Sequence, residues 1–299
     1  MTPSGRPRLP WWAWPSVLSL DAPAVAVAWS WALADAAGAS FTLLEAAVVG
    51  LATASVYLLD RRLDVTAIHD ARTATRRHAW TAAHARAVTA GALATGSATG
   101  ILALGLPWHQ IAWGLAVAVG AALLLLRPLG RAGAATHDRP DGATPAAARD
   151  RPRGVGARRP RLRPLGVGAV FAAGTALPAV DGALATIAPA AFLLAAVAAL
   201  NVALIAGWER ALDDGSGRGP HAPRRGPWAG APSVGTGLSL AATAWIARPW
   251  LSELGAALAL AALLLASLEL VGDRWPAELR HLAADGALLI GLLPLAAGA

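Results

Sequence analysis

The chain has 299 residues, of which 56% are hydrophobic and only 14% are charged, and its formal net charge is +7. Because a soluble domain carries about 25% charged residues, this composition excludes an ordinary soluble enzyme. The sequence contains no cysteine, which excludes disulfides and thiolate metal sites. The basic residues are all arginines, and no phosphate loop, GxSxG or nucleic-acid-binding motif occurs. We therefore expect no nucleic-acid partner.

Apolar segments of membrane-spanning length recur along most of the chain. A helix needs about 20 apolar residues to cross ~30 Å of hydrocarbon, and helices are the only plausible spanning form for runs this long. We therefore predict an all-α polytopic membrane bundle in the lipid bilayer. Its transmembrane helices, about nine, are expected at 22–38, 40–59, 79–105, 108–127, 165–181, 184–208, 232–248, 250–271 and 282–298.

Two segments are expected outside the bilayer. Residues 1–18 are predicted to form a cytoplasmic N-terminal segment before a transmembrane domain at 19–299; prolines interrupt the segment, unlike a signal peptide. Residues 130–164 are rich in Arg, Pro, Gly and Ala without apolar periodicity, which predicts a disordered cytoplasmic insert. This insert is either a solvated linker with topogenic charge or a segment attracted to anionic lipid headgroups.

The arginines determine the expected orientation. With the N-terminus in the cytoplasm, only Arg248 falls on the outer side of the nine predicted spans, as the positive-inside rule requires. The C-terminus is then periplasmic or extracellular. The abundance of alanine and arginine is typical of a GC-rich bacterial genome, so we expect a multi-pass protein of the bacterial inner membrane.

Two acid pairs lie at predicted cytoplasmic helix ends: Asp60 and Asp64 in VYLLDRRLD, and Glu209 and Asp213 in WERALD. Residues four apart share a helix face, so each pair can direct two carboxylates into one cleft. Such a pair repels itself unless a cation compensates, and Mg²⁺ combines a few carboxylate oxygens with water and phosphate. The alternative is that these are ordinary charged helix ends. Their matching positions before long connections favour a site for Mg²⁺ and a diphosphate.

These residues resemble motifs of the UbiA superfamily of intramembrane prenyltransferases, which have nine helices and two Asp-rich motifs after helices two and six. Against the family pattern NDxxDxxxD, the stretch VYLLDRRLD matches the last two acids, and it places Val56 and Tyr57 where Asn and the first Asp belong. The stretch ERALD matches the second, DxxxD-type motif. The phrases SLDAPAVAVAWSW, RRHAWTAAH, GAVFAAGTALP and ADGALLIGLLP also resemble a bacterial UbiA-like branch.

The resemblance implies a Mg²⁺-dependent enzyme that transfers a prenyl group from a prenyl diphosphate to an apolar acceptor, aromatic or lipid-like. It implies that the catalytic and metal-binding residues are Asp60, Asp64, Glu209 and Asp213. Arginines suit the diphosphate oxygens, polar residues inside spans are functional candidates, and an aromatic face can stabilise a cation. The substrate-binding candidates are accordingly Arg61, Arg62, Arg76, Arg77, Tyr57, Asn201, Asp21 and His78.

Several of these candidates have a structural alternative. Asp21 is most simply a helix N-cap, Tyr57 is equally suited to packing, and His78 and His84 at an interface are usually structural. Asp285, inside the last predicted span, is a further interior polar residue.

Two other functions are left open: a non-catalytic UbiA-like protein that binds isoprenoids or lipids, and a transporter that uses intramembrane polar residues as a relay. The acid pairs cluster on one side of the predicted membrane, which disfavours the transporter. The sequence predicts no oligomeric state.

Overall fold

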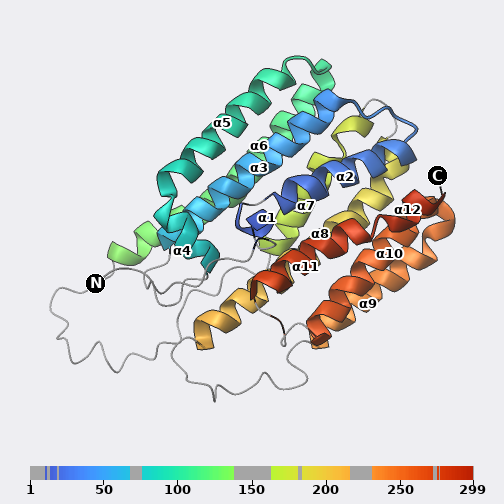
Figure 1. The fold of residues 1–299 in the computed structure, drawn as a ribbon. Coiled ribbons are helices and arrows are strands. Elements are labelled where there is room, and N and C mark those ends of the chain that lie inside the picture. The colour runs from blue at the N-terminus through green and yellow to red at the C-terminus, as the bar shows by residue number, and fades with distance from the viewer. Residues whose placement is uncertain are drawn as a thin grey trace.

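The computed structural model describes residues 11, 14–18, 20–67, 76–137, 163–180, 184–215, 231–271, 275 and 277–298. All regular elements in these ranges are helices (Figure 1), so the all-α prediction is confirmed for this part of the chain. In chain order they are α1 (Trp14–Val17), α2 (Asp21–Ala36), α3 (Leu43–Ala67), α4 (Arg76–Ala83), α5 (Ala85–Ala103), α6 (Trp108–His137), α7 (Arg163–Thr175), the 3₁₀ turn η2 (Leu177–Ala179), α8 (Leu184–Gly215), α9 (Ala231–Ile246), α10 (Arg248–Val271), α11 (Ala277–Ile290) and α12 (Leu293–Gly298).

The helices follow the predicted apolar segments, with four main differences, one of which is that the segment at 282–298 is divided into α11 and α12. The segment expected at 79–105 is broken at His84, where the backbone leaves the helical region and separates α4 from α5. The segment at 165–181 ends in a 3₁₀ turn that contains Pro178, which cannot donate a helical hydrogen bond. Helix α6 continues to His137 and α7 begins at Arg163, so both overlap the ends of the expected insert. Residues 138–162 of that insert lie outside the described residues.

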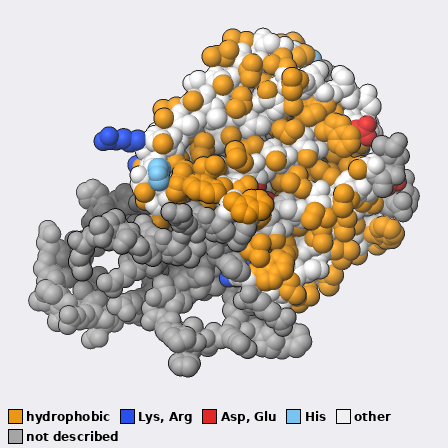
Figure 2. Space-filling view, in the orientation of Figure 1, with side chains coloured by type: hydrophobic (Ala, Val, Ile, Leu, Met, Phe, Trp, Pro, Cys, Tyr) orange, Lys and Arg blue, Asp and Glu red, His pale blue; other side chains and the backbone are white. Residues whose placement is uncertain are grey.

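Within the described ranges, five helical stretches are long and apolar enough to cross a membrane: Leu43–Val65, Trp108–Leu126, Leu184–Glu209, Glu253–Val271 and Leu279–Ala296. Helices α2, α7 and α9 have 16, 13 and 16 residues. At 1.5 Å per residue, each is shorter than a ~30 Å hydrocarbon layer. Hydrophobic side chains are spread over the face shown in Figure 2, and few charged ones are visible on its described part. The length of the five apolar stretches and the hydrophobic surface are typical of a helical membrane protein.

Helix α2 lies inside the bundle and packs against α3, α7, α8 and α11. Its Trp29 is fully buried, and the indole Nε1 donates to the Leu288 carbonyl of α11 at 3.2 Å. The contact between α7 and α8 is closer still, because a Cβ at Gly168 would clash with the Ala195 carbonyl and lie 2.8 Å from the Ala199 nitrogen. Small residues allow this close backbone approach in membrane helices.

Helix α11 is fixed against α10 in a similar way, at the turn that follows it. A Cβ at Gly291 would lie 2.7 Å from the Ala261 Cβ and 3.0 Å from the Ala257 carbonyl oxygen. Glycine is therefore the residue that lets the end of α11 reach the small side chains of α10.

One end of the bundle, named here the polar end, is where α3, α8 and α10 finish and α2, α7 and α11 begin (Figure 1). Contacts between the element ends define it. Arg61 of α3 donates to the Val17 carbonyl of α1, just before α2, at 2.5 Å. Trp208 of α8 donates to Glu269 of α10 at 2.8 Å.

Candidate functional site: an acid pair and a buried amide–carboxylate pair

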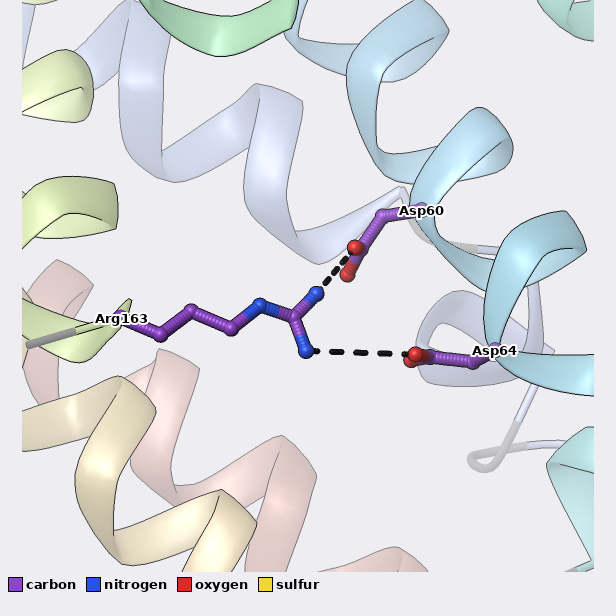
Figure 3. Close-up of polar contacts among 3 residues, drawn as sticks. All are labelled: Asp60, Asp64 and Arg163. Atoms are coloured by element: carbon purple, nitrogen blue, oxygen red, sulfur yellow. Dashed lines mark hydrogen bonds and ion pairs between the residues drawn. The ribbon is translucent and has the colours of Figure 1, made fainter. Parts of the chain in front are cut away.

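The first predicted acid pair lies at the polar end, on the last turns of α3 (Figure 3). Asp60 and Asp64 are four residues apart and both point towards one guanidinium, that of Arg163 at the first position of α7. The Arg163 Nη2 lies 2.5 Å from Asp60 Oδ1, and Nη1 lies 4.0 Å from Asp64 Oδ1. The prediction that both acids share one helix face is confirmed by this geometry.

Charge explains why Arg163 lies there. Two carboxylates one turn apart repel each other, and a guanidinium has two separate N–H directions with which to meet both. The side chains of Asp60 and Asp64 are 35% and 26% exposed, so solvent or a ligand reaches them. Ion pairs with this exposure contribute little to stability, which leaves the carboxylates exchangeable.

Sequence reasoning missed Arg163. It is the last of many arginines in the stretch at 149–163, and nothing in that run distinguishes it from its neighbours. Arg163 lies directly before the apolar residues of the fifth predicted segment, where the start of a helix fixes the position of the residue. This is the one feature of the sequence that could have singled it out.

Three other predicted site residues lie on α3, close to the acid pair. Arg61 is buried and is held by the Val17 carbonyl, whereas Arg62 is half-buried. Tyr57, one turn before Asp60, is also half-buried. The charges that act on its hydroxyl are those of Asp285, Asp21 and Asp60, with Arg61 acting in the opposite sense. Tyr57 therefore lies within electrostatic range of carboxylates on α2 and α11.

Asp21 is not the N-cap that the sequence suggests. It is the first residue of α2, with Leu20 in the cap position, and its Oδ1 accepts from the Ala22 nitrogen at 3.0 Å. A carboxylate in the first turn still interacts favourably with the helix dipole. The Asp21 side chain is 9% exposed, which agrees with the expectation that it can face the interior of the bundle.

A second polar site lies deeper, between α8 and α11. The amide Nδ2 of Asn201 donates to Asp285 Oδ1 at 2.9 Å. Asn201 is buried, and its Oδ1 has no hydrogen-bond partner among the described residues. Both residues were predicted as interior polar groups, but the sequence did not indicate that they would pair.

The same two helices meet again at the polar end. The Arg280 guanidinium lies 5.8 Å from the centre of the Trp208 ring, and Trp208 is 1% exposed. Its indole is committed to Glu269, so Trp208 is an interior residue and not part of an interfacial aromatic belt. The pairs 201–285 and 208–280 show that α8 and α11 are antiparallel neighbours in one register.

The second predicted acid pair is described only in part. Glu209 is half-buried on α8, and the side chain of Asp213 lies outside the described side chains, as do those of Arg76, Arg77 and His78. Among the side chains that are described, no three His, Asp or Glu residues are grouped closely enough to hold a metal ion. The convergence of four carboxylates on one metal therefore stays a prediction.

Asp60 and Asp64 nevertheless fit Mg²⁺ by their chemistry. Mg²⁺ is usually bound by one or two carboxylates, with waters and phosphate oxygens completing its shell. The two carboxylates face a common cationic group and are accessible from solvent. They are the described residues that would hold the ion.

Comparison with known proteins finds no relative that could explain these two sites. The resemblance to the UbiA superfamily thus depends on the sequence phrases given above, and a function has to be argued from the two polar sites. No protein family, curated protein or solved structure matches the chain.

Proposed function

We propose that this protein is a Mg²⁺-dependent prenyltransferase of the bacterial inner membrane, UbiA-like in fold, with about nine transmembrane helices. It moves a prenyl group from a prenyl diphosphate to an apolar, aromatic or lipid-like acceptor. The N-terminus and the polar end face the cytoplasm, and the C-terminus faces the other side. The observation that carries the proposal is the pair of accessible carboxylates, Asp60 and Asp64, which share one cationic partner at the mouth of an apolar bundle.

Each part of the substrate has a matching part of the protein. A prenyl chain would lie along the apolar side chains of the bundle, which are mostly Ala, Leu and Val. Mg²⁺ held by Asp60 and Asp64, together with Glu209 and Asp213, would neutralise the diphosphate and improve it as a leaving group. Arg163 and Arg62 lie at the same end and offer N–H donors for phosphate oxygens.

The protein must also protect the cation that forms when the diphosphate leaves. Tyr57 is one turn deeper than Asp60, so its ring lies between the charged end and the apolar interior. An aromatic face stabilises a cation within about 6 Å of the ring centre. The surrounding carboxylates of Asp285 and Asp21 add negative potential at the same place.

Turnover by the purified protein in nanodiscs tests this function. Wild-type protein with geranylgeranyl diphosphate, MgCl₂ and a membrane lipid extract as the source of the acceptor should release pyrophosphate, and EDTA should stop the release. Asp64→Asn and Asp213→Asn should each lower the rate by roughly 100-fold, because a bound metal contributes several kcal/mol to such a step. Asp35→Asn, at an exposed position near the end of α2, is the matched control and should keep the wild-type rate. Full activity in both of the first two variants would refute the metal-site assignment.

A non-catalytic isoprenoid-binding protein is the second candidate, and two observations favour it. Val56 and Tyr57 replace two metal-ligand positions of the UbiA-type motif, and Arg163 already compensates the remaining two acids. Such a protein would bind geranylgeranyl diphosphate in equilibrium dialysis without releasing pyrophosphate. The same assay therefore separates the two candidates.

A further inference from the structure

A further cluster of polar side chains lies at the far end of the bundle, where α2 and α5 finish and α3 and α6 begin. Glu45 of α3 accepts from Gln110 of α6 at 2.9 Å, which fixes the direction of the Gln110 amide. Since an ionised carboxylate only accepts, Nε2 faces Glu45 and Oε1 faces away. Gln110 is 3% exposed, and its Oε1 has no hydrogen-bond partner among the described residues. The cluster therefore presents a buried acceptor without a donor.

Ser30 of α2 presents a second oxygen of this kind. Hydroxyl groups inside a helix commonly donate to the carbonyl four residues back, as those of Thr53, Thr99 and Ser267 do. Ser30 is completely buried, but its Oγ makes no such bond and meets no other partner in the described ranges. A buried polar atom left unpaired is unfavourable and uncommon. Two of them on helices that meet at one end of the bundle indicate a site for a ligand.

Packing brings Ser30 to the level of the contact between Glu45 and Gln110. Ala26 of α2 and Val49 of α3 belong to one buried apolar cluster. Ser30 follows Ala26 by one helical turn, and Glu45 precedes Val49 by one turn. Residues four apart share a helix face, and α2 and α3 are packed together in opposite directions. The hydroxyl, the carboxylate and the amide therefore lie on the same side of this cluster, towards the far end.

Glu45 adds a buried negative charge to these oxygens. Its hydrogen bonds come from Thr42 and Gln110, and no cationic side chain in the described part of the chain contacts it. The helix dipoles compensate the charge little, because the positive starts of α3 and α6 follow closely on the negative ends of α2 and α5. Glu45 is inside a stretch long and apolar enough to span a membrane, where ionisable residues mark ion sites by default. A positively charged ligand is therefore favoured.

We propose that Gln110 Oε1 and Ser30 Oγ are two of the ligands of a sodium ion that is bound beside Glu45. Hard cations prefer oxygen ligands, and one buried carboxylate balances one positive charge. A monovalent ion therefore suits the site better than Mg²⁺, which also gives up its water reluctantly. Glu45 supplies charge and not a ligand oxygen, because its oxygens are used by Thr42 and Gln110. The ion connects α2 to α6, and the inference does not rest on the proposed function.

Thermal unfolding in NaCl and in choline chloride tests the site, because the two salts at about 150 mM screen charges equally. The full-length protein in detergent micelles is followed by the fluorescence of its tryptophans. Wild-type protein should melt about 3 °C higher in NaCl, since an ion that binds the folded state alone stabilises it. Equal melting temperatures in the two salts would overturn the proposal and leave buried water as the partner of both oxygens.

Two variants locate the ion. Ser30→Ala removes a ligand oxygen and leaves no polar atom unpaired in its place, so it should fold, and the difference between the salts should fall by roughly half or more. Glu45→Gln removes the charge and adds a donor that faces Gln110, so the Gln110 oxygen turns inward and the difference should disappear. Ser267→Ala, which removes an exposed hydroxyl from α10, is the matched control and should keep the full difference. A full difference in Ser30→Ala, or in a folded Glu45→Gln, would overturn the assignment.

Asp64→Asn distinguishes this site from the acid pair at the polar end. Sodium bound between Asp60 and Asp64 would also raise the melting temperature of wild type, but its effect would be lost in Asp64→Asn and kept in Ser30→Ala. That outcome would overturn the proposal, which requires the full difference in Asp64→Asn and a reduced one in Ser30→Ala. The result is independent of pyrophosphate release, so the sodium site and the prenyltransferase can each fail without the other.

Discussion

Helix α3 carries a carboxylate site at each end, and the two sites are built differently. At its start, Glu45 is 5% exposed and uses both oxygens: Oε2 accepts from the Thr42 nitrogen and hydroxyl, each at 2.7 Å, and Oε1 accepts from Gln110 at 2.9 Å. The Thr42 hydroxyl in turn accepts from the Glu45 nitrogen, which completes a capping box. At the other end, Asp60 and Asp64 share one guanidinium and remain open to solvent.

The difference shows how one helix separates structure from chemistry. A buried carboxylate whose oxygens are all used by the protein holds elements together and has no capacity for a ligand. A partly exposed ion pair exchanges its partner at little cost. The carboxylate at the start of α3 therefore stabilises the fold, whereas the carboxylates at its end are available to a ligand.

The sharpest test of this contrast is removal of Glu45. Glu45→Ala should lower the free energy of unfolding by about 3 kcal/mol, because it removes a helix cap and leaves the buried amide donor of Gln110 unpaired. Unfolding in mixed micelles, followed by circular dichroism, measures the loss. Asp64→Ala is the matched control at the other end of the helix and should cost less than about 1 kcal/mol. Equal losses in the two variants would contradict the distinction.

A smaller effect is expected where α7 meets α8, because α7 carries the cationic partner of the acid pair. Gly168→Ala should cost about 2 kcal/mol, since a methyl group there overlaps the backbone of α8. The displacement should reach Arg163 and disturb the Asp60–Asp64 end, while the Glu45 end stays unchanged.

Gly207→Ala serves as the control for that substitution, because a methyl at Gly207 meets nothing within 4 Å. It should raise helix stability by roughly 0.5–1 kcal/mol. The prediction for Gly168 fails if both alanines are tolerated equally in thermal unfolding.

The smallest effect concerns Arg163 itself. Arg163→Gln should cost about 1 kcal/mol or less, because the ion pair is partly exposed. Without this guanidinium, the two carboxylates should bind a divalent cation more tightly. MgCl₂ at millimolar concentration should raise the melting temperature of the variant more than that of wild type, as binding to the folded state alone requires. Arg86→Gln, at an exposed position at the start of α5, is the control. An identical response to Mg²⁺ in all three proteins would contradict the assignment of the pair as a cation site.

Much of the helical pattern could be predicted, since it depends on local composition. Apolar runs placed the helices, and the four-residue spacing placed Asp60 and Asp64 on one face. The break at His84 was missed because the residues on both sides favour a helix and no glycine or proline marks the break. The capping box at Thr42 and Glu45 has a sequence signature, Thr-x-x-Glu, which was available and not used.

The candidate site was less predictable, because its contacts join distant parts of the chain. Arg163 meets Asp60 across 103 positions and Asn201 meets Asp285 across 84. The angle at which α7 crosses α8 determines which arginine of the basic run reaches the acid pair. That angle depends on the close approach of the two helices at Gly168. Hydropathy and spacing contain no information on that angle.

The turn at Gly291 has a mechanical consequence for the deeper site. At this turn the chain lies directly against the backbone of α10, so we expect α11 and α10 to shift together. Asp285 lies six residues before this turn, and its depth in the bilayer is therefore governed by α10 and not by the connection that precedes α11. Any opening that admits a lipid-soluble molecule has to come from other helices.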